Sequence, residues 1–139
     1  VYTYIRRSSP YPSMLTFDGS TRDVCLARRI RTNTPLQALV TLNDTAFVEM
    51  AQRFAQRMEF EGGETVGEQI KKGYWWMTGH DIPQPKQRIF QNLYQEALVR
   101  FKKDPKKQEE WMCNATPESA ALAVVANIML NMDEFITKE

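Results

Sequence analysis

The sequence of residues 116–130 is TPESAALAVVANIML. Thr116 and Pro117 form a helix start, because threonine caps the free backbone N–H groups and proline fits the first helical turn. The residues that follow are apolar on nearly every side of a helix, which is typical of a helix buried in the middle of its domain. Asn127 and Asn131 lie one turn apart on one side of it, and each needs a hydrogen-bond partner if it is buried. We therefore expect the other helices to pack around this segment.

The segments before this helix have helical patterns of their own. Thr34-Pro35-Leu36-Gln37 is a capping box, in which the Thr34 hydroxyl accepts from the Gln37 backbone N–H and the Gln37 side chain reaches back to the Thr34 N–H. Asp44 can start a second helix, which Gly62-Gly63 would end. Apolar residues at spacings of three and four indicate further helices. The predicted helices cover residues 34–43, 44–58, 65–77, 89–103, 105–112 and 116–130.

The first 33 residues have no such pattern. Ser8–Ser13 contains two prolines, which disfavour a helix, and Phe17-Asp18-Gly19-Ser20 is typical of a turn. The sequence therefore predicts an all-α protein with a single domain. It would consist of a compact bundle of about five or six helices over residues 34–139 and an irregular, arginine-rich arm, residues 1–33, packed on that bundle.

The composition excludes several classes of protein. The chain has 139 residues with 18 basic and 17 acidic side chains, and this net charge of +1 provides no drive toward nucleic acid or an anionic membrane. One histidine, His80, and two cysteines, Cys25 and Cys113, are too few for zinc fingers or a Cys-x-x-Cys-His haem attachment. The cysteines are more typical of buried free thiols than of a disulfide, although export would permit pairing. The longest apolar-rich run, residues 120–132, is shorter than the roughly 20 residues that cross a bilayer.

Charge is distributed unevenly along the chain. Residues 1–34 contain six arginines and two aspartates, a net charge of +4, and no lysine occurs before Lys71. The planar guanidinium fork suits carboxylates and carbonyls in ordered networks, so we expect a segment that ion pairs hold in place. The polar residues of this structural network are Asp18, Asp23, Asn33, Thr34, Gln37, Asn43 and Asp44.

The same cluster permits a binding role. Its arginines lie near the positive end of the helix that starts at Thr34, which would favour an anion or a sugar acid. The oxygen atoms of the network also suit calcium, but their spacing does not match an EF-hand loop, and we predict no metal site. Trp75-Trp76 could form a carbohydrate-stacking platform, although packing in the core or an interface is the stronger expectation. The candidate anion ligands are Arg22, Arg28, Arg29 and Arg31.

Several stretches of the sequence resemble a known family. Arg22-Asp23-Val24-Cys25, Arg31-Thr32-Asn33-Thr34-Pro35-Leu36-Gln37-Ala38-Leu39-Val40 and the closing Val125-Ala126-Asn127 and Leu130-Asn131-Met132-Asp133-Glu134-Phe135 are similar to a bacterial domain of unknown function. That domain forms the C-terminal part of large planctomycete-type, cytochrome-c-associated proteins and is also frequent in Bacteroidetes. The resemblance covers essentially the whole chain, although residues 60–116 match only in helical pattern.

The resemblance implies a setting for the chain. It would be the C-terminal piece of a larger exported protein, in the periplasm or at the cell surface. Some proteins of this kind have a haem-binding domain far upstream, so haem c is expected on another part of the polypeptide and no cofactor in this segment. No catalytic residues are established for such domains, so we predict none here.

Two functions remain open at this point. The first is a non-catalytic structural or interaction domain, whose arm docks against preceding domains of the same polypeptide or a protein partner. The second is binding of an anion or carbohydrate, or an accessory catalytic role, in a polysaccharide-degrading or cytochrome-c-linked redox system. We favour the first, because capped, core-forming helices and a long irregular arm are typical of a structural module.

Overall fold

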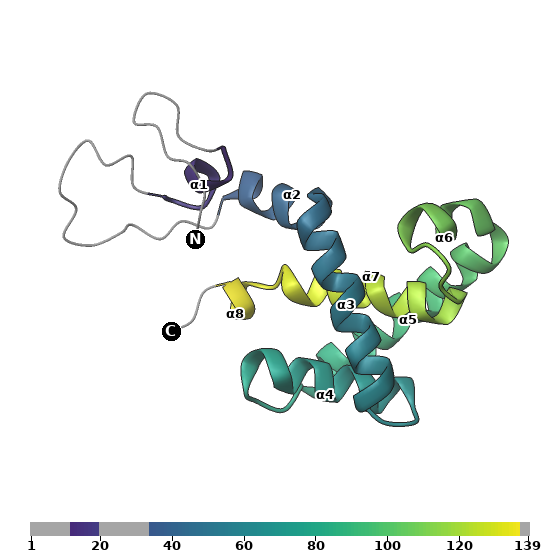
Figure 1. Ribbon diagram of the computed structural model, residues 1–139. Helices are drawn as coiled ribbons and strands as arrows, with labels where there is room; N and C mark the ends of the chain where they lie inside the picture. The colour runs from purple at the N-terminus through teal and green to yellow at the C-terminus, as the bar shows by residue number, and fades with distance from the viewer. Residues whose placement is uncertain (1–11, 20–33, 137–139) are drawn as a thin grey trace, which may run out of the picture. The chain divides into compact units, whose positions relative to one another are not determined.

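The computed structural model describes residues 12–19 and 34–136, and every regular element within these ranges is a helix (Figure 1). This confirms the predicted all-α class, with six helices of seven residues or more. None of the described helices is both long and apolar enough to cross a membrane. The helices are α1 (Pro12–Thr16), α2 (Pro35–Asn43), α3 (Thr45–Glu61), α4 (Val66–Thr78), α5 (Gln84–Lys103), α6 (Pro105–Trp111), α7 (Pro117–Leu130) and α8 (Asp133–Ile136).

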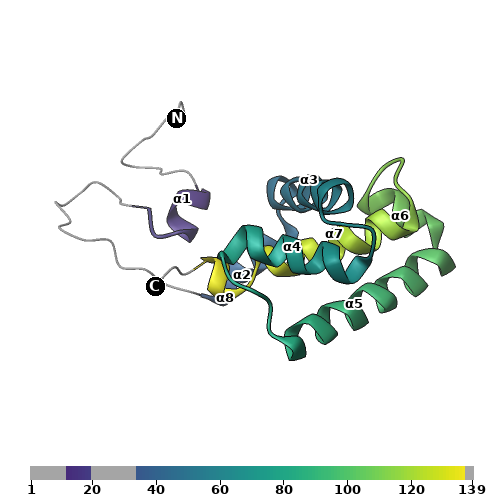
Figure 2. The same ribbon diagram turned by 90° about the horizontal axis from the view of Figure 1, so that it is seen from below.

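The chain divides into two compact units, residues 1–40 and 41–139, and the division falls within α2. The smaller unit contains α1 and the first part of α2. In the larger unit, α7 is the central helix and packs most extensively against α3 and α5. Figure 2 shows α3 and α5 on opposite sides of α7. The helices α4, α6 and α8 also contact α7, so this unit is assembled around it.

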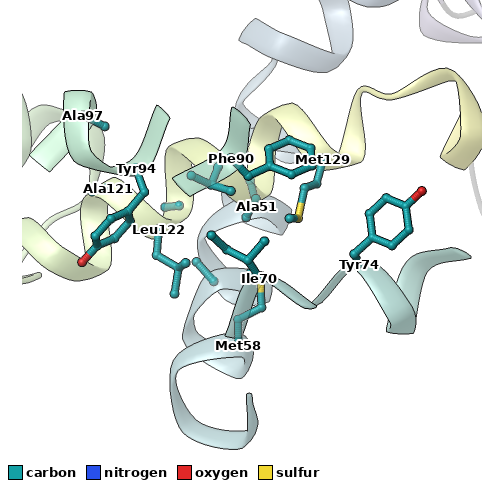
Figure 3. Close-up of a cluster of buried hydrophobic side chains, with 14 of the residues drawn as sticks. Ala51, Met58, Ile70, Tyr74, Phe90, Tyr94, Ala97, Ala121, Leu122 and Met129 are labelled. Carbon is teal, nitrogen blue, oxygen red and sulfur yellow. The ribbon is translucent and has the colours of Figure 1, made fainter. Parts of the chain in front are cut away.

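The side chains of α7 explain its central position. Its four alanines are fully buried, and their small size lets α3 and α5 approach closely. Leu122, Val125 and Met129 fill the remaining space, and each is at most 2% exposed. Figure 3 shows Leu122 and Met129 together with Met58 of α3 and Ile70 of α4 in this cluster. The prediction that this helix is buried is therefore confirmed.

The helix ends follow local capping signals. Asp44 and Thr116 cap α3 and α7 as predicted, each accepting from a backbone N–H two or three residues further on, at 2.9 Å and 3.1 Å. Thr65 and Glu68 form a second capping box, at the start of α4. Gly79 ends α4 with φ 75°, a left-handed conformation that glycine adopts without strain. Each cap satisfies backbone groups that a helix end leaves without partners.

Three helices differ from the sequence-based expectation. Within the arm predicted to be irregular, the five-residue helix α1 begins at Pro12, and α5 begins at Gln84, before the predicted start at residue 89. The physical reason is the same in both places. Proline breaks a helix interior but fits the first turn, where its missing N–H is not needed. The four-residue helix α8 was not predicted, because it is too short to show periodicity.

Asn127 of α7 and Asn131, the residue that follows the helix, form hydrogen bonds with the α2–α3 junction. The Asn127 side chain is 5% exposed, and its Nδ2 donates to the carbonyl oxygen of Leu42 at 3.1 Å. The Thr41 hydroxyl donates to Oδ1 of Asn131. The amide nitrogen of Asn127 therefore has the partner that burial requires, whereas its Oδ1 is buried without a hydrogen-bond partner among the described residues. The partners lie far away in sequence, at the end of α2.

The buried alanines of α7 can be tested by enlarging one of them. Ala123 is 0% exposed, so Ala123→Leu forces extra atoms between α7 and its neighbours. We expect a loss of about 1–3 kcal/mol in the free energy of unfolding, measured by urea denaturation. Ala46→Leu, at an exposed position of α3, is the matched control and should change stability by less than about 0.5 kcal/mol. Equal effects of the two substitutions would contradict the close packing around α7.

Candidate functional site

Much of the arginine-rich cluster lies outside the residues that the structure describes. The structural network and the anion site therefore stay predictions for this part of the chain. The residues concerned are Arg22, Asp23, Arg28, Arg29, Arg31 and Asn33.

Gln37 connects the described members of the cluster in the smaller unit. It is 3% exposed, and its Nε2 donates to the carbonyl oxygen of Thr16 at 2.7 Å and to Oδ2 of Asp18 at 3.4 Å. Its Oε1 accepts from the Thr34 N–H at 3.0 Å, while the Thr34 hydroxyl accepts from the Gln37 N–H at 3.3 Å, which confirms the capping box. A glutamine amide has a donor and an acceptor at the same end, and both are used here. Gln37 therefore ties the start of α2 to the turn after α1.

The backbone after α1 places Asp18 beside Gln37. Asp18 has φ 54°, in the left-handed region that aspartate tolerates better than most residues. The next residue, Gly19, donates its N–H to the carbonyl oxygen of Met14 and closes the turn. The expected turn is thus present over its described residues, 17–19. Its geometry directs a carboxylate toward the α2 capping box.

The two remaining described residues of the network lie in the larger unit. Asn43 is exposed and ends α2, and Asp44 caps α3 through its hydrogen bond to the Ala46 N–H. The structure therefore brings Asp18, Thr34 and Gln37 together. Asp44, by contrast, serves the start of its own helix.

The role of Gln37 can be tested by removing its donor. Gln37→Glu keeps the acceptor for Thr34 but directs a second oxygen at the Thr16 carbonyl and the Asp18 carboxylate. We expect a local cost of about 1–3 kcal/mol, so that the backbone amide of Ala38 exchanges with solvent at least about fivefold faster by NMR. Gln95→Glu, the same change at an exposed position of α5, should leave this exchange rate unaltered. Unchanged exchange in Gln37→Glu would contradict the assigned hydrogen bonds.

A second polar cluster, which the sequence analysis did not predict, connects α8 to α4 and α5. The Tyr74 hydroxyl of α4 donates to Oε2 of Glu134 at 2.8 Å, and Lys86 of α5 forms an ion pair with the other carboxylate oxygen. The hydroxyl of Tyr74 points away from the apolar cluster in Figure 3. Glu134 therefore links α8 to two other helices. The only local signal was the acidic pair at 133–134, which suits the first turn of a helix.

The pKa shifts in this cluster have clear causes. The Lys86 ammonium, followed by the Tyr74 hydroxyl, lowers the pKa of Glu134. The hydrogen bond to Glu134 raises the pKa of Lys86. Burial, followed by the hydrogen bond to Glu134, raises the pKa of Tyr74. The stability that Glu134 contributes is therefore present above its unfolded pKa, and it is lost as pH falls through its lower folded pKa. The stability that Lys86 contributes is lost as pH rises through its higher folded pKa.

This linkage predicts that Glu134→Gln causes a small, pH-dependent loss in the free energy of unfolding. The Lys86 and Glu134 side chains are 37% and 46% exposed, so solvent screening limits the loss in unfolding free energy at neutral pH to about 1 kcal/mol or less. In strong acid the Glu134 carboxyl of the unsubstituted chain is protonated and therefore uncharged, like the glutamine of the variant. The difference in unfolding free energy between the two chains should then shrink. Urea denaturation at both pH values measures it. Glu110→Gln, at an exposed position of α6, is the control, and a loss that is equal at both pH values would contradict the ion pair.

A hollow of about 440 Å³ lies where α5, α6 and α7 meet, and we call it the cationic hollow. Apolar side chains and charged side chains both line it. Asp104 caps α6 and lies 3.6 Å from Nζ of Lys107, whereas Arg100 and Lys103 have no ion-pair partner among the described residues. Arg100 and Lys103 are therefore available to a ligand, beside the exposed Glu96 carboxylate, which also lines the hollow. The lining residues are Leu93, Glu96, Ala97, Arg100, Phe101, Lys103, Asp104, Lys107 and Val124.

The two adjacent tryptophans of α4 have different surroundings. Trp76 packs edge-on against Phe54, with ring centroids 6.4 Å apart, and the Arg57 guanidinium lies 4.4 Å from its centroid. Trp76 therefore meets the expectation of a packing residue. Trp75 is 52% exposed. Neighbouring helix positions face directions about 100° apart, so one ring is packed while the other reaches solvent.

Two further residues singled out from the sequence, His80 and Cys113, are exposed, whereas Cys25 lies outside the described residues. His80 lies on the α4–α5 connection. Cys113 is an exposed free thiol, so the expectation of burial was wrong for this cysteine, which follows the short helix α6 in a turn. The hydrogen bond from its Sγ to Glu109 raises the pKa of the thiol. Among the described residues, no three histidine, cysteine, aspartate or glutamate side chains form a group suited to a metal ion.

The fold and these contacts define a small all-α domain in which many polar side chains serve helix ends and helix–helix contacts. A family model described as "PSD1: Protein of unknown function (DUF1553)" matches residues 1–110. The chain therefore belongs to this family. The match confirms the resemblance to a domain of unknown function that the sequence motifs indicated. Comparison with curated proteins found no match, and neither did comparison with solved structures.

Proposed function

We propose that this chain is a non-catalytic interaction domain of a larger exported bacterial protein. In this proposal, the cationic hollow binds an acidic, partly apolar protein segment from the preceding domains of the same polypeptide. The observation that supports it is the combination of an apolar floor with the cationic groups of Arg100 and Lys103 at the rim.

The chemistry of the hollow favours such a segment over other ligands. Leu93, Phe101 and Val124 provide a surface on which an aliphatic or aromatic side chain can lose its contact with water. Arg100 and Lys103 can then pair with carboxylates on either side of that side chain. A purely polar anion would leave the floor unused. A purely apolar segment would leave the cations without partners.

The polar contacts inside the domain support a structural role rather than a catalytic one. Thr65, Asp104 and Thr116 are engaged in helix caps, and Glu134 links helices. Gln37 makes its hydrogen bonds to two backbone groups and to Asp18. Groups that hold backbone ends and helix contacts are committed to the fold, which agrees with a module whose exposed faces do the binding.

The same proposal includes the cellular location of the domain and the other parts of its polypeptide. Export to the periplasm or cell surface, and haem c on another part of the polypeptide, follow from the resemblance to cytochrome-c-associated proteins. Membership of a family of unknown function is compatible with this setting. The preceding domains would then be held close to the cationic hollow at a high effective concentration, so that even a weak contact would be well populated.

The proposal is tested with the full 139-residue chain and a labelled peptide that has two leucines flanked by glutamates. We expect saturable binding by fluorescence anisotropy that weakens with salt. The double variant Arg100→Ala/Lys103→Ala should bind about tenfold more weakly, because two rim ion pairs at about 0.7 kcal/mol each are lost.

The control variant is Lys71→Ala/Lys72→Ala, which removes the same number of charges from α4 and should leave peptide affinity unchanged. A peptide with lysines in place of the glutamates should not bind. Equal binding of the two peptides, or no effect of Arg100→Ala/Lys103→Ala, would overturn the proposal.

A further inference from the structure

The outer face of α4 contains a second hollow, which is independent of the cationic hollow. Glu68, Lys71, Lys72 and Trp75 have the i, i+3, i+4, i+7 spacing of one helix face, and all four are exposed. Together with Gly62 and Asp81, which follow α3 and α4, they line an open hollow of about 540 Å³. We call it the Trp75 hollow.

Trp75 is an aromatic platform in this hollow. Trp75 is 52% exposed, whereas its neighbour Trp76 is packed against Phe54. It is the only aromatic side chain among the residues that line the hollow. A single ring surrounded by charge offers little apolar area for a protein partner, whose binding usually depends on a cluster of buried side chains. It is large enough for the apolar face of one sugar ring to stack on it.

The charges around Trp75 indicate which kind of sugar would fit. The Glu68 carboxylate is engaged in the capping box, where it accepts from the Thr65 N–H at 3.1 Å. Glu68 keeps its negative charge in the capping box, while Lys71, Lys72 and Asp81, two cations and one anion, have no ion-pair partner among the described residues. A ligand with hydroxyl groups and one carboxylate per ring would use all three, since ammonium groups pair with carboxylates and an aspartate accepts from hydroxyls.

We propose that the Trp75 hollow binds uronic-acid-containing carbohydrate. A sugar ring stacks on Trp75, its carboxylate pairs with Lys71 and Lys72, and Asp81 accepts from its hydroxyl groups. All of these residues lie in the larger unit, on or beside α4, and none of them lines the cationic hollow. The carbohydrate proposal can therefore be tested independently of the proposed protein contact.

The test uses the full chain with tetragalacturonate as the uronate probe and cellotetraose as the neutral comparison. Isothermal titration calorimetry should show saturable binding of tetragalacturonate. Trp75→Ala should weaken it at least tenfold. Lys71→Ala/Lys72→Ala should also weaken it at least fivefold and abolish the preference over cellotetraose. Both changes are at exposed positions, and circular dichroism checks that the helices are retained.

Two matched controls separate the site from general surface effects. Ile89→Ala removes an apolar side chain that is 63% exposed on α5, and Arg100→Ala/Lys103→Ala removes two cations from the other hollow. Neither should change sugar affinity. No saturable binding, or binding that survives Trp75→Ala, overturns the proposal. Equal affinity for cellotetraose and tetragalacturonate overturns the assignment of a uronic acid, and binding of the acidic peptide that depends on Trp75 overturns the assignment of a carbohydrate.

Discussion

Burial of α7 between α3 and α5 is the interaction on which the larger unit depends. Each large apolar side chain of α7 that is removed from water contributes about 1.5–3 kcal/mol to folding. Its alanines set how closely the neighbouring helices approach, because extra atoms in a close-packed interior must displace others. The amides of Asn127 and Asn131 then attach the α2–α3 junction to this central helix. Packing and hydrogen bonding therefore converge on one segment.

A central helix of this kind leaves the outer faces of the surrounding helices available for binding. The inner side of α4 contributes Ile70 and Tyr74 to the core, while Lys71, Lys72 and Trp75 remain outside. The same division on α5 places the cationic groups of its last turn at the rim of the cationic hollow. The two proposed binding surfaces thus lie on different helices of one scaffold. This separation is why substitutions in either one serve as controls for the other.

Local signals predicted the capped starts of α2, α3 and α7, whereas they could not predict hydrogen-bond partners that are distant in sequence. Thr34, Asp44 and Thr116 cap their helices as the sequence indicated, because a cap depends on residues within one turn. The need of Asn127 for a hydrogen bond was also foreseen, but its partner Leu42 is distant in sequence. The side chain of Gln37 was assigned to the capping box, and its additional hydrogen bonds on the α1 side came from the fold.

The helical class, the capped starts and the central position of α7 could all be inferred from the order of residues, since periodicity and capping are local properties. The exposure of Trp75 beside a packed Trp76 could not be inferred in this way. The two residues are identical neighbours in the sequence, and only the side chains around them in the folded chain differ. The same holds for the contacts of Glu134 with Tyr74 and Lys86. These join residues from three helices, and it is their packing around α7 that brings them together.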